Sequence, residues 1–291
     1  MIFKSAVLRK VQPKVQFSLS DRQASLLVPI GDIHYGDHAF PKKHFKDHIK
    51  WCVDRGAYFL GMGDYLDLGS ESQRKIIAGL RESTREQLDE KIMIQAAELV
   101  DLLEPTRGRW LGMLRGNHSW DFLDATCVEQ FLCAFMGRGC DFLGDSALIR
   151  LISGKGPEGD TIVCCHHGKG SSQTIGGQLN KPEQLLKYVS ADLILMGHSH
   201  AKLVGSIDKI NITPDGVMFH RTTLVARTGA FLKAYEGREP LPLKEPAYLS
   251  GGSYVERGAM MPSSMGGICF SIGTAGIDGS KYYRPVLHYS V

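Results

Sequence analysis

The stretch SLLVPIGDIH, residues 25–34, sets the pattern on which the fold prediction rests. An apolar run that ends at Ile30 leads into a glycine and then into two metal-capable side chains, Asp32 and His34. A short apolar run bounded by turn residues is typical of a buried β-strand. The stretch therefore predicts a strand that delivers an aspartate and a histidine to the loop at its carboxyl end.

The chain repeats this arrangement four more times. At the carboxyl edge of an α/β sheet the strands are rigid and the loops are free to vary, so functional side chains gather there. A glycine stands near each of these polar groups, where it lets the backbone turn sharply or approach an ion closely. The repeats are AYFLGMGD (57–64), WLGMLRGNH (110–118), DTIVCCHHG (160–168) and ADLILMGHSH (191–200), and the glycines are Gly31, Gly63, Gly116 and Gly197.

Seven metal-capable positions result from the five stretches. Imidazoles and carboxylates suit zinc, iron and manganese, and a shared carboxylate can hold two cations about 3.5–4 Å apart. The inventory therefore predicts metal-assisted hydrolysis. Its members are Asp32, His34, Asp64, Asn117, His166, His198 and His200.

Five motifs follow one another between Asp32 and His200: D-x-H, G-D-x-x-D, G-N-H, a lone H and G-H-x-H. In these motifs and their order the chain resembles the calcineurin-like metallophosphoesterase family. The resemblance implies a four-layer α/β/β/α sandwich of two mixed sheets flanked by helices, with residues 1–291 as one domain. It also implies two divalent ions, for which Mn, Fe, Zn, Co and Ni are all candidates. One ion would be bound by Asp32, His34 and His200, the other by Asn117, His166 and His198, and Asp64 would bridge them.

The same resemblance assigns catalytic roles. A hydroxide bridging the metals would attack phosphorus, and His118 would donate a hydrogen bond or a proton to the leaving group. Asp67 could orient His118, although an aspartate there could instead cap a helix. Since adjacent strand residues face opposite sides, only one of two neighbouring histidines can face the metals, and the resemblance favours His166. Candidate substrate-binding residues are His167, Lys169 and Arg115.

Two departures from the family narrow the function. Leu68 stands where protein serine/threonine phosphatases have arginine, and Ser119 replaces the usual acidic residue. Residues 166–185, HHGKGSSQTIGGQLNKPEQL, look more like small phosphoesterases of phage and prophage genomes. The sequence thus favours a phosphodiesterase acting on nucleotide-like or other small diesters. The alternatives are a Mre11-like DNA nuclease, a phosphomonoesterase and a non-catalytic binding module.

Periodic apolar residues predict helices over 42–56, 85–105 and 120–139, and a further helix after Pro182. Beyond His200 the chain reads as strands in hairpins, over 219–231, 266–274 and 282–291. We expect residues 1–24 to form an extension or edge strand and 231–265 a long loop. The basic stretch within 69–86 could bind phosphates or nucleic acid, but a solvated helix explains it better.

Composition bounds the remaining possibilities. A net charge of +3 over 291 residues is too small to indicate nucleic-acid binding by itself, although such binding stays possible. There is no apolar run of about 18 residues and no secretion signal near Met1, so we expect a cytoplasmic protein, or one in the host cytoplasm if phage-encoded, with no membrane partner. The seven scattered cysteines predict buried free thiols. The expected partner is a small phosphoester or nucleotide substrate, and the oligomeric state stays open.

Overall fold

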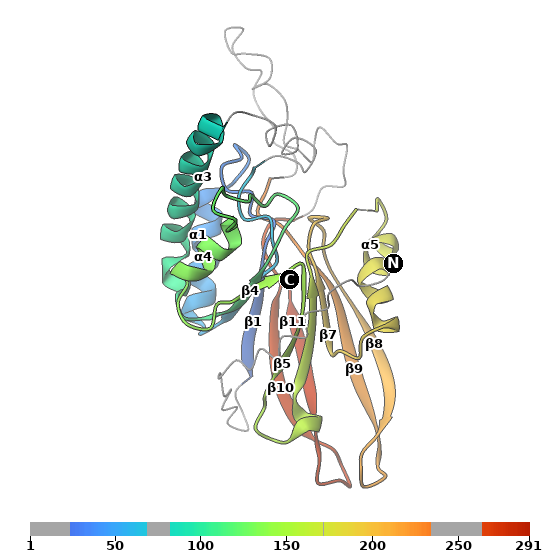
Figure 1. The fold of residues 1–291 in the computed structure, drawn as a ribbon. Helices are drawn as coiled ribbons and strands as arrows, with labels where there is room; N and C mark the ends of the chain where they lie inside the picture. The colour runs from blue at the N-terminus through green and yellow to red at the C-terminus, as the bar shows by residue number, and fades with distance from the viewer. Residues whose placement is uncertain (1–23, 69–81, 171, 234–263) are drawn as a thin grey trace.

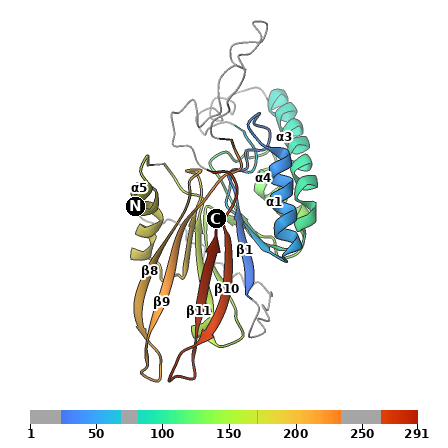
Figure 2. The ribbon, with the colours of Figure 1, turned by 180° about the vertical axis from the view of Figure 1, so that it is seen from behind.

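Two mixed β-sheets pack face to face, and helices cover their outer faces (Figure 1). The computed structural model describes residues 24–68, 82–170, 172–233 and 264–291. Helices lie on both outer sides of the paired sheets in the two opposite views (Figures 1 and 2). The four-layer α/β/β/α prediction is therefore confirmed.

The first sheet has six strands in the order β11-β10-β1-β2-β3-β4. Strands β1 to β4 pair in parallel, and β10 pairs antiparallel with both β1 and β11. The parallel strands therefore share one carboxyl edge. The bounds are Ser25–Ile30 (β1), Tyr58–Gly61 (β2), Trp110–Leu114 (β3), Phe142–Gly144 (β4), Cys269–Gly276 (β10) and Tyr283–Ser290 (β11).

The second sheet has five strands in the order β5-β6-β7-β9-β8. Its central strands β6, β7 and β9 are parallel, and the edge strands β5 and β8 pair antiparallel with β6 and β9. β5 and β8 are not predicted by the sequence, because their partly exposed residues do not form a long continuous apolar run. The bounds are Ser146–Leu151 (β5), Thr161–His166 (β6), Leu193–Met196 (β7), Lys202–Ile212 (β8) and Met218–Thr228 (β9).

In the described ranges, α1, α3 and α4 cover the first sheet and α5 covers the second (Figure 1). Side chains of α1, α3 and α4 pack on β1, β2 and β3 in one apolar core, and a second core fills the space between the sheets. The last turns of α5 lead to a smaller core on the outer face of the second sheet. The bounds are Lys42–Asp54 (α1), Glu82–Leu103 (α3), Val128–Phe135 (α4) and Ile175–Gln184 (α5).

Two helices differ from their prediction. α4 begins only at Val128, because the preceding residues form a turn in which Ala125 has a φ of 66°. α5 begins at Ile175, well before Pro182, since the Thr174 hydroxyl accepts a hydrogen bond from the Gly177 N–H and caps the helix. The helices predicted over 42–56 and 85–105 are confirmed by α1 and α3.

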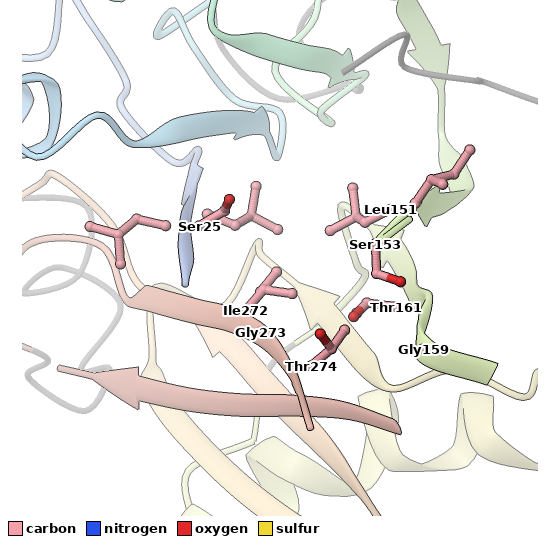
Figure 3. A pocket seen from close by; sticks show the side chains of 11 residues that line it. Ser25, Leu151, Ser153, Gly159, Thr161, Ile272, Gly273 and Thr274 are labelled. Atoms are coloured by element: carbon pink, nitrogen blue, oxygen red, sulfur yellow. The ribbon is translucent and has the colours of Figure 1, made fainter. Parts of the chain in front are cut away.

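A small cavity lies between the sheets at the amino ends of β1 and β6, where Ser25, Thr161 and Thr274 line it (Figure 3). Its volume of about 20 Å³ accommodates roughly one water molecule. The polar motifs follow the carboxyl ends of the same strands, so the cavity lies at the opposite edge from them.

Other predictions are decided at this level. All seven cysteines are buried and free, as predicted. None of the helices in the described ranges is long and apolar enough to cross a membrane. The predictions for 1–24, 69–86 and 231–265 lie largely outside the described residues.

Candidate metal centre

The polar motifs converge at the common carboxyl edge of the two sheets. Backbone hydrogen bonds join the loop after β1 to the loop after β2, from Asp32 N–H to Gly63 O (2.9 Å) and from Ile33 N–H to Asp64 O (2.9 Å). Motifs separated by more than 100 residues also meet in this cluster, which contains three groups of possible metal ligands. Two of them are largely buried, and the third, made of His34, Asp67 and His118, shares His34 with the first.

The first group consists of Asp32, His34 and His200, whose donor atoms lie within 4.8 Å of one another. Nε2 of His34 lies 3.2 Å from Nε2 of His200, which is 3.7 Å from Oδ1 of Asp32. Asp32 is fully buried, and its Oδ1 has no hydrogen-bond partner among the described residues. A buried carboxylate oxygen without a donor is costly, and a bound cation would compensate it.

The second group consists of Asp64, His167 and His198. Nε2 of His167 lies 3.2 Å from Oδ2 of Asp64. Oδ1 of Asn117 lies 2.8 Å from the same Nε2 and 2.6 Å from Nδ1 of His198. One carboxylate, two imidazoles and an amide oxygen therefore surround one point, a donor set that suits first-row divalent metals.

Asp64 connects the two groups. Its Oδ2 is 3.2 Å from the His167 imidazole of one group and 3.9 Å from Nε2 of His34 in the other. Its Oδ1 accepts a hydrogen bond from the backbone N–H of His118 at 2.8 Å. This placement fits a carboxylate shared between two cations.

The structure brings together six of the seven predicted ligands, and it places His167, in the position expected for His166, beside them. Val163 and Cys165 face the space between the sheets, so alternation sends His167 to the same side and His166 to the other. Nδ1 of His166 accepts a hydrogen bond from the Gly168 N–H. His167 instead donates its Nδ1–H to the Met62 carbonyl at 2.7 Å, which leaves Nε2 for a cation.

Glycines beside the ligands allow the loops to pack against one another. A Cβ on Gly63 would lie 2.6 Å from Nδ1 of His167, and one on Gly197 would lie 2.8 Å from Oδ2 of Asp32. A Cβ on Gly116 would overlap Asp64. Side chains at these positions would displace the ligands of a neighbouring loop, a packing role that the sequence does not reveal.

Most of the candidate ligands have a left-handed backbone. Among described residues other than glycine, six have positive φ, and five of these are candidate ligands. Such conformations cost of order 1–3 kcal/mol each and collect at functional sites. The φ values are 47° for Asp32, 48° for His34, 50° for Asp64, 69° for His198 and 57° for His200.

The sequence motifs and this geometry agree with the comparison to protein families. A model described as calcineurin-like phosphoesterase matches residues 27–202. The chain belongs to the calcineurin-like phosphoesterase family. A comparison with curated proteins returned no match.

Two solved structures show low similarity to this family member. Vps29 from Chaetomium thermophilum matches with a TM-score of 0.35 and 10% identity, over 92% of this chain and 96% of that one. A double mutant of Vps29 from Entamoeba histolytica matches with a TM-score of 0.32 and 15% identity, over 91% of this chain and 99% of that one.

The two buried aspartates of the cluster differ in pKa. Burial raises the pKa of Asp32 to about 6, and the charge of Asp64 adds to this effect while His167 opposes it. Burial would also raise the pKa of Asp64, but His167 and His34 together hold it well below its usual range. Asp64 is therefore the carboxylate that stays ionised over the whole physiological range.

The histidines of the cluster also differ in the direction of their pKa shifts. Burial would lower the pKa of His167, but the Asp64 carboxylate outweighs it and raises the pKa to about 9. Burial lowers the pKa of His198 to about 4 and that of His200 to about 3, so both imidazoles are neutral and keep a lone pair for a cation. A cation entering the second group must therefore displace the proton of His167.

His118 and Asp67 lie beside the first group, as the family resemblance implies. Nδ1 of His118 is 3.5 Å from Oδ1 of Asp67, and Nδ1 of His34 is 3.7 Å from the same oxygen. The nearby imidazoles of His118 and His34 hold the pKa of Asp67 well below its usual range. The Asp67 carboxylate therefore faces both rings and can orient His118.

The predicted substrate-binding residues differ in their pairing and exposure. Both oxygens of Asp121 accept hydrogen bonds from Arg115 at 2.7 Å, so this guanidinium is already paired. Lys169 is exposed, whereas His167 is buried within the ligand cluster.

The two departures from the family also have a structural account. Leu68 packs against the apolar core between the first sheet and its helices. The Ser119 hydroxyl donates a 2.6 Å hydrogen bond to the buried carboxyl of Glu129. The residue next to His118 is thus hydrogen-bonded to a carboxyl group of α4. This contact joins residues ten positions apart, and the sequence does not predict it.

Proposed function

We propose that this protein is a metal-dependent phosphoric ester hydrolase that prefers diesters. The observation that carries the proposal is the meeting of two ligand groups at Asp64, with His118 and Asp67 beside them. Two divalent ions bound there would polarise a phosphoryl oxygen and lower the pKa of a water molecule. The expected ligands are Asp32, His34 and His200 for one ion, Asn117, His167 and His198 for the other, and Asp64 for both.

The protein's own groups supply positioning and proton transfer. Nδ1 of His118 faces Asp67, which leaves Nε2 to hold a proton toward the leaving oxygen of the ester. The side chain of His118 is 15% exposed, so a substrate can reach it. Asp64 also holds the backbone of His118 in place, because its Oδ1 accepts a hydrogen bond from the His118 N–H.

The charges around the site favour a diester over a monoester. A monoester carries two negative charges near neutral pH and a diester one, so a monoester needs more cationic side chains. Among the described residues near the ligands, Arg115 is paired with Asp121, and Leu68 stands where related protein phosphatases have arginine. Of the other nearby cations, Lys169 is exposed, and Arg227 is buried with its guanidinium bound to the Gln178 and Gly197 carbonyls.

The proposal is tested by hydrolysis assays with the manganese-loaded protein on bis(p-nitrophenyl) phosphate, p-nitrophenyl phosphate, cyclic nucleotides and single-stranded DNA. We expect the diester to be hydrolysed faster than the monoester. His118→Ala should lower kcat by about 10²–10⁴-fold while the metal content is unchanged. Asp64→Asn should lower both.

Each contrary result has a defined meaning. Faster hydrolysis of the monoester would reverse the diester preference. Cleavage of DNA, together with an affinity for DNA that falls steeply as the salt concentration rises, would support the nuclease alternative instead. A protein that binds manganese but hydrolyses no ester would be a binding module, and the proposal would be wrong.

A further inference from the structure

Arg227 carries a buried charge near the carboxyl end of β9. Its side chain is among the largest fully buried ones in the described part of the chain, and the residue is 1% exposed. No carboxylate of the described residues forms an ion pair with it. Burial lowers its pKa to about 10 against the opposing effect of Asp32, so the guanidinium remains a cation at neutral pH. A buried cation without a paired carboxylate is costly, which indicates a specific task.

The guanidinium connects two backbone carbonyls from different elements. Nε donates to the Gln178 carbonyl in α5 at 2.8 Å, and a terminal nitrogen donates to the Gly197 carbonyl at 2.9 Å. In a regular helix the N–H of residue 182 would donate to the carbonyl of Gln178. That residue is Pro182, which has no N–H, so Arg227 supplies the missing donor.

The second carbonyl belongs to the peptide that positions a candidate ligand. Gly197 O and His198 N are the two ends of one peptide group. Arg227 donates to the carbonyl, and Oδ2 of Asp32 accepts from the N–H at 2.9 Å. The peptide plane is therefore held from both sides, and it precedes His198, whose φ of 69° is unfavourable for a non-glycine residue.

We propose that Arg227 is a positioning residue for the metal centre: it holds the Gly197–His198 peptide in the orientation that places His198 in the second ligand group. This inference rests on the proposed function. Through the Gln178 carbonyl it also links that peptide to α5, which follows the loop carrying Lys169. Lysine would keep the charge but has one nitrogen in place of the planar fork, so it cannot reach both carbonyls with the same geometry.

The test is a Co²⁺ titration followed by visible absorption, because the d–d bands report the geometry around each ion. We expect Arg227→Lys to weaken binding of one Co²⁺ equivalent by about 10–100-fold and to change its spectrum, while the other equivalent is unchanged. The matched control is Arg221→Lys on the same strand, where the native arginine pairs with Asp192 at 2.6 Å, far from the ligands. This control should lower thermal stability and leave both Co²⁺ equivalents as in wild type.

Pro182→Ala is a second variant that keeps Arg227 and restores a helical donor to the Gln178 carbonyl. It should weaken the same Co²⁺ equivalent by a smaller factor, and it carries the test if Arg227→Lys does not fold. Wild-type affinities and spectra in both variants would overturn the role of Arg227. A wild-type protein that binds fewer than two Co²⁺ ions would instead contradict the proposed two-metal function.

Discussion

Gly116→Ala should disrupt the metal centre through one added methyl group. The new Cβ would lie 2.9 Å from Cγ of Asp64, and closer still to its Oδ1 and backbone N. Ordinary contact begins at 3.4 Å, so Asp64 would have to retreat by at least about 0.5 Å (3.4 − 2.9). Metal ligands tolerate deviations of only about 0.2 Å. Asp64 is 2% exposed, and any retreat would move it relative to the other ligands of the cluster.

We therefore expect metal affinity to fall by about 100-fold or more, with a loss of about 1–3 kcal/mol in the free energy of unfolding from overpacking. Manganese binding is measured by calorimetry and stability by chemical denaturation. The matched control is Gly176→Ala in α5, where an added Cβ meets nothing within 4 Å and should change stability by no more than about 1 kcal/mol. If the Gly116→Ala protein bound two ions with wild-type affinity, the packing argument and the bridging role of Asp64 would both be wrong.

Replacing each of the adjacent histidines in turn should separate their roles. We expect His167→Ala to lose one bound metal ion in elemental analysis and His166→Ala to keep the wild-type number of bound ions. Because an incoming cation must displace the proton of His167, whose pKa is about 9, apparent manganese affinity should rise about tenfold per pH unit between pH 6.5 and 8.5. A pH-independent affinity would refute this linkage. Burial, with His44 and Lys202, lowers the pKa of His48 to about 4, so between pH 6.5 and 4 the unfolded chain binds a proton that the folded chain does not. Folding stability should thus fall by up to about 3 kcal/mol as the pH decreases through this window, and denaturation of His48→Gln should show a flatter pH dependence.

The elements that could be predicted are those whose sequences repeat one physical pattern. β1, β2, β3, β6 and β7 are central strands, so continuous apolar runs mark them. The turn of each run into a polar loop then places the ligands, because parallel strands share a carboxyl edge. The edge strand β8 has one partner and partly exposed side chains, and its pattern was too weak to predict.

The parts that could not be predicted depend on contacts between distant residues. Whether His166 or His167 faces Asp64 depends on which face of β6 packs on the other sheet. Arg115 and Asp121 lie close in sequence, yet their pairing depends on the conformation of the loop between them. The hydrogen bond from Arg227 in β9 to the carbonyl of Gly197, in the loop after β7, has no local signature in the sequence.

The left-handed backbone of the ligands relates the fold to the metal affinity that we propose. Five residues at roughly 1 kcal/mol each amount to about 5 kcal/mol, comparable with the whole stability of a small domain. Packing supports these conformations, through glycines that admit neighbouring ligands and through the hydrogen bond from Arg227 to the Gly197 carbonyl. A cation that binds only the folded chain would add to folding stability by an amount set by its concentration relative to its dissociation constant, and its affinity depends on how firmly these loops hold the ligands. The substitutions that loosen these loops should therefore weaken metal binding more than they lower the stability of the metal-free chain.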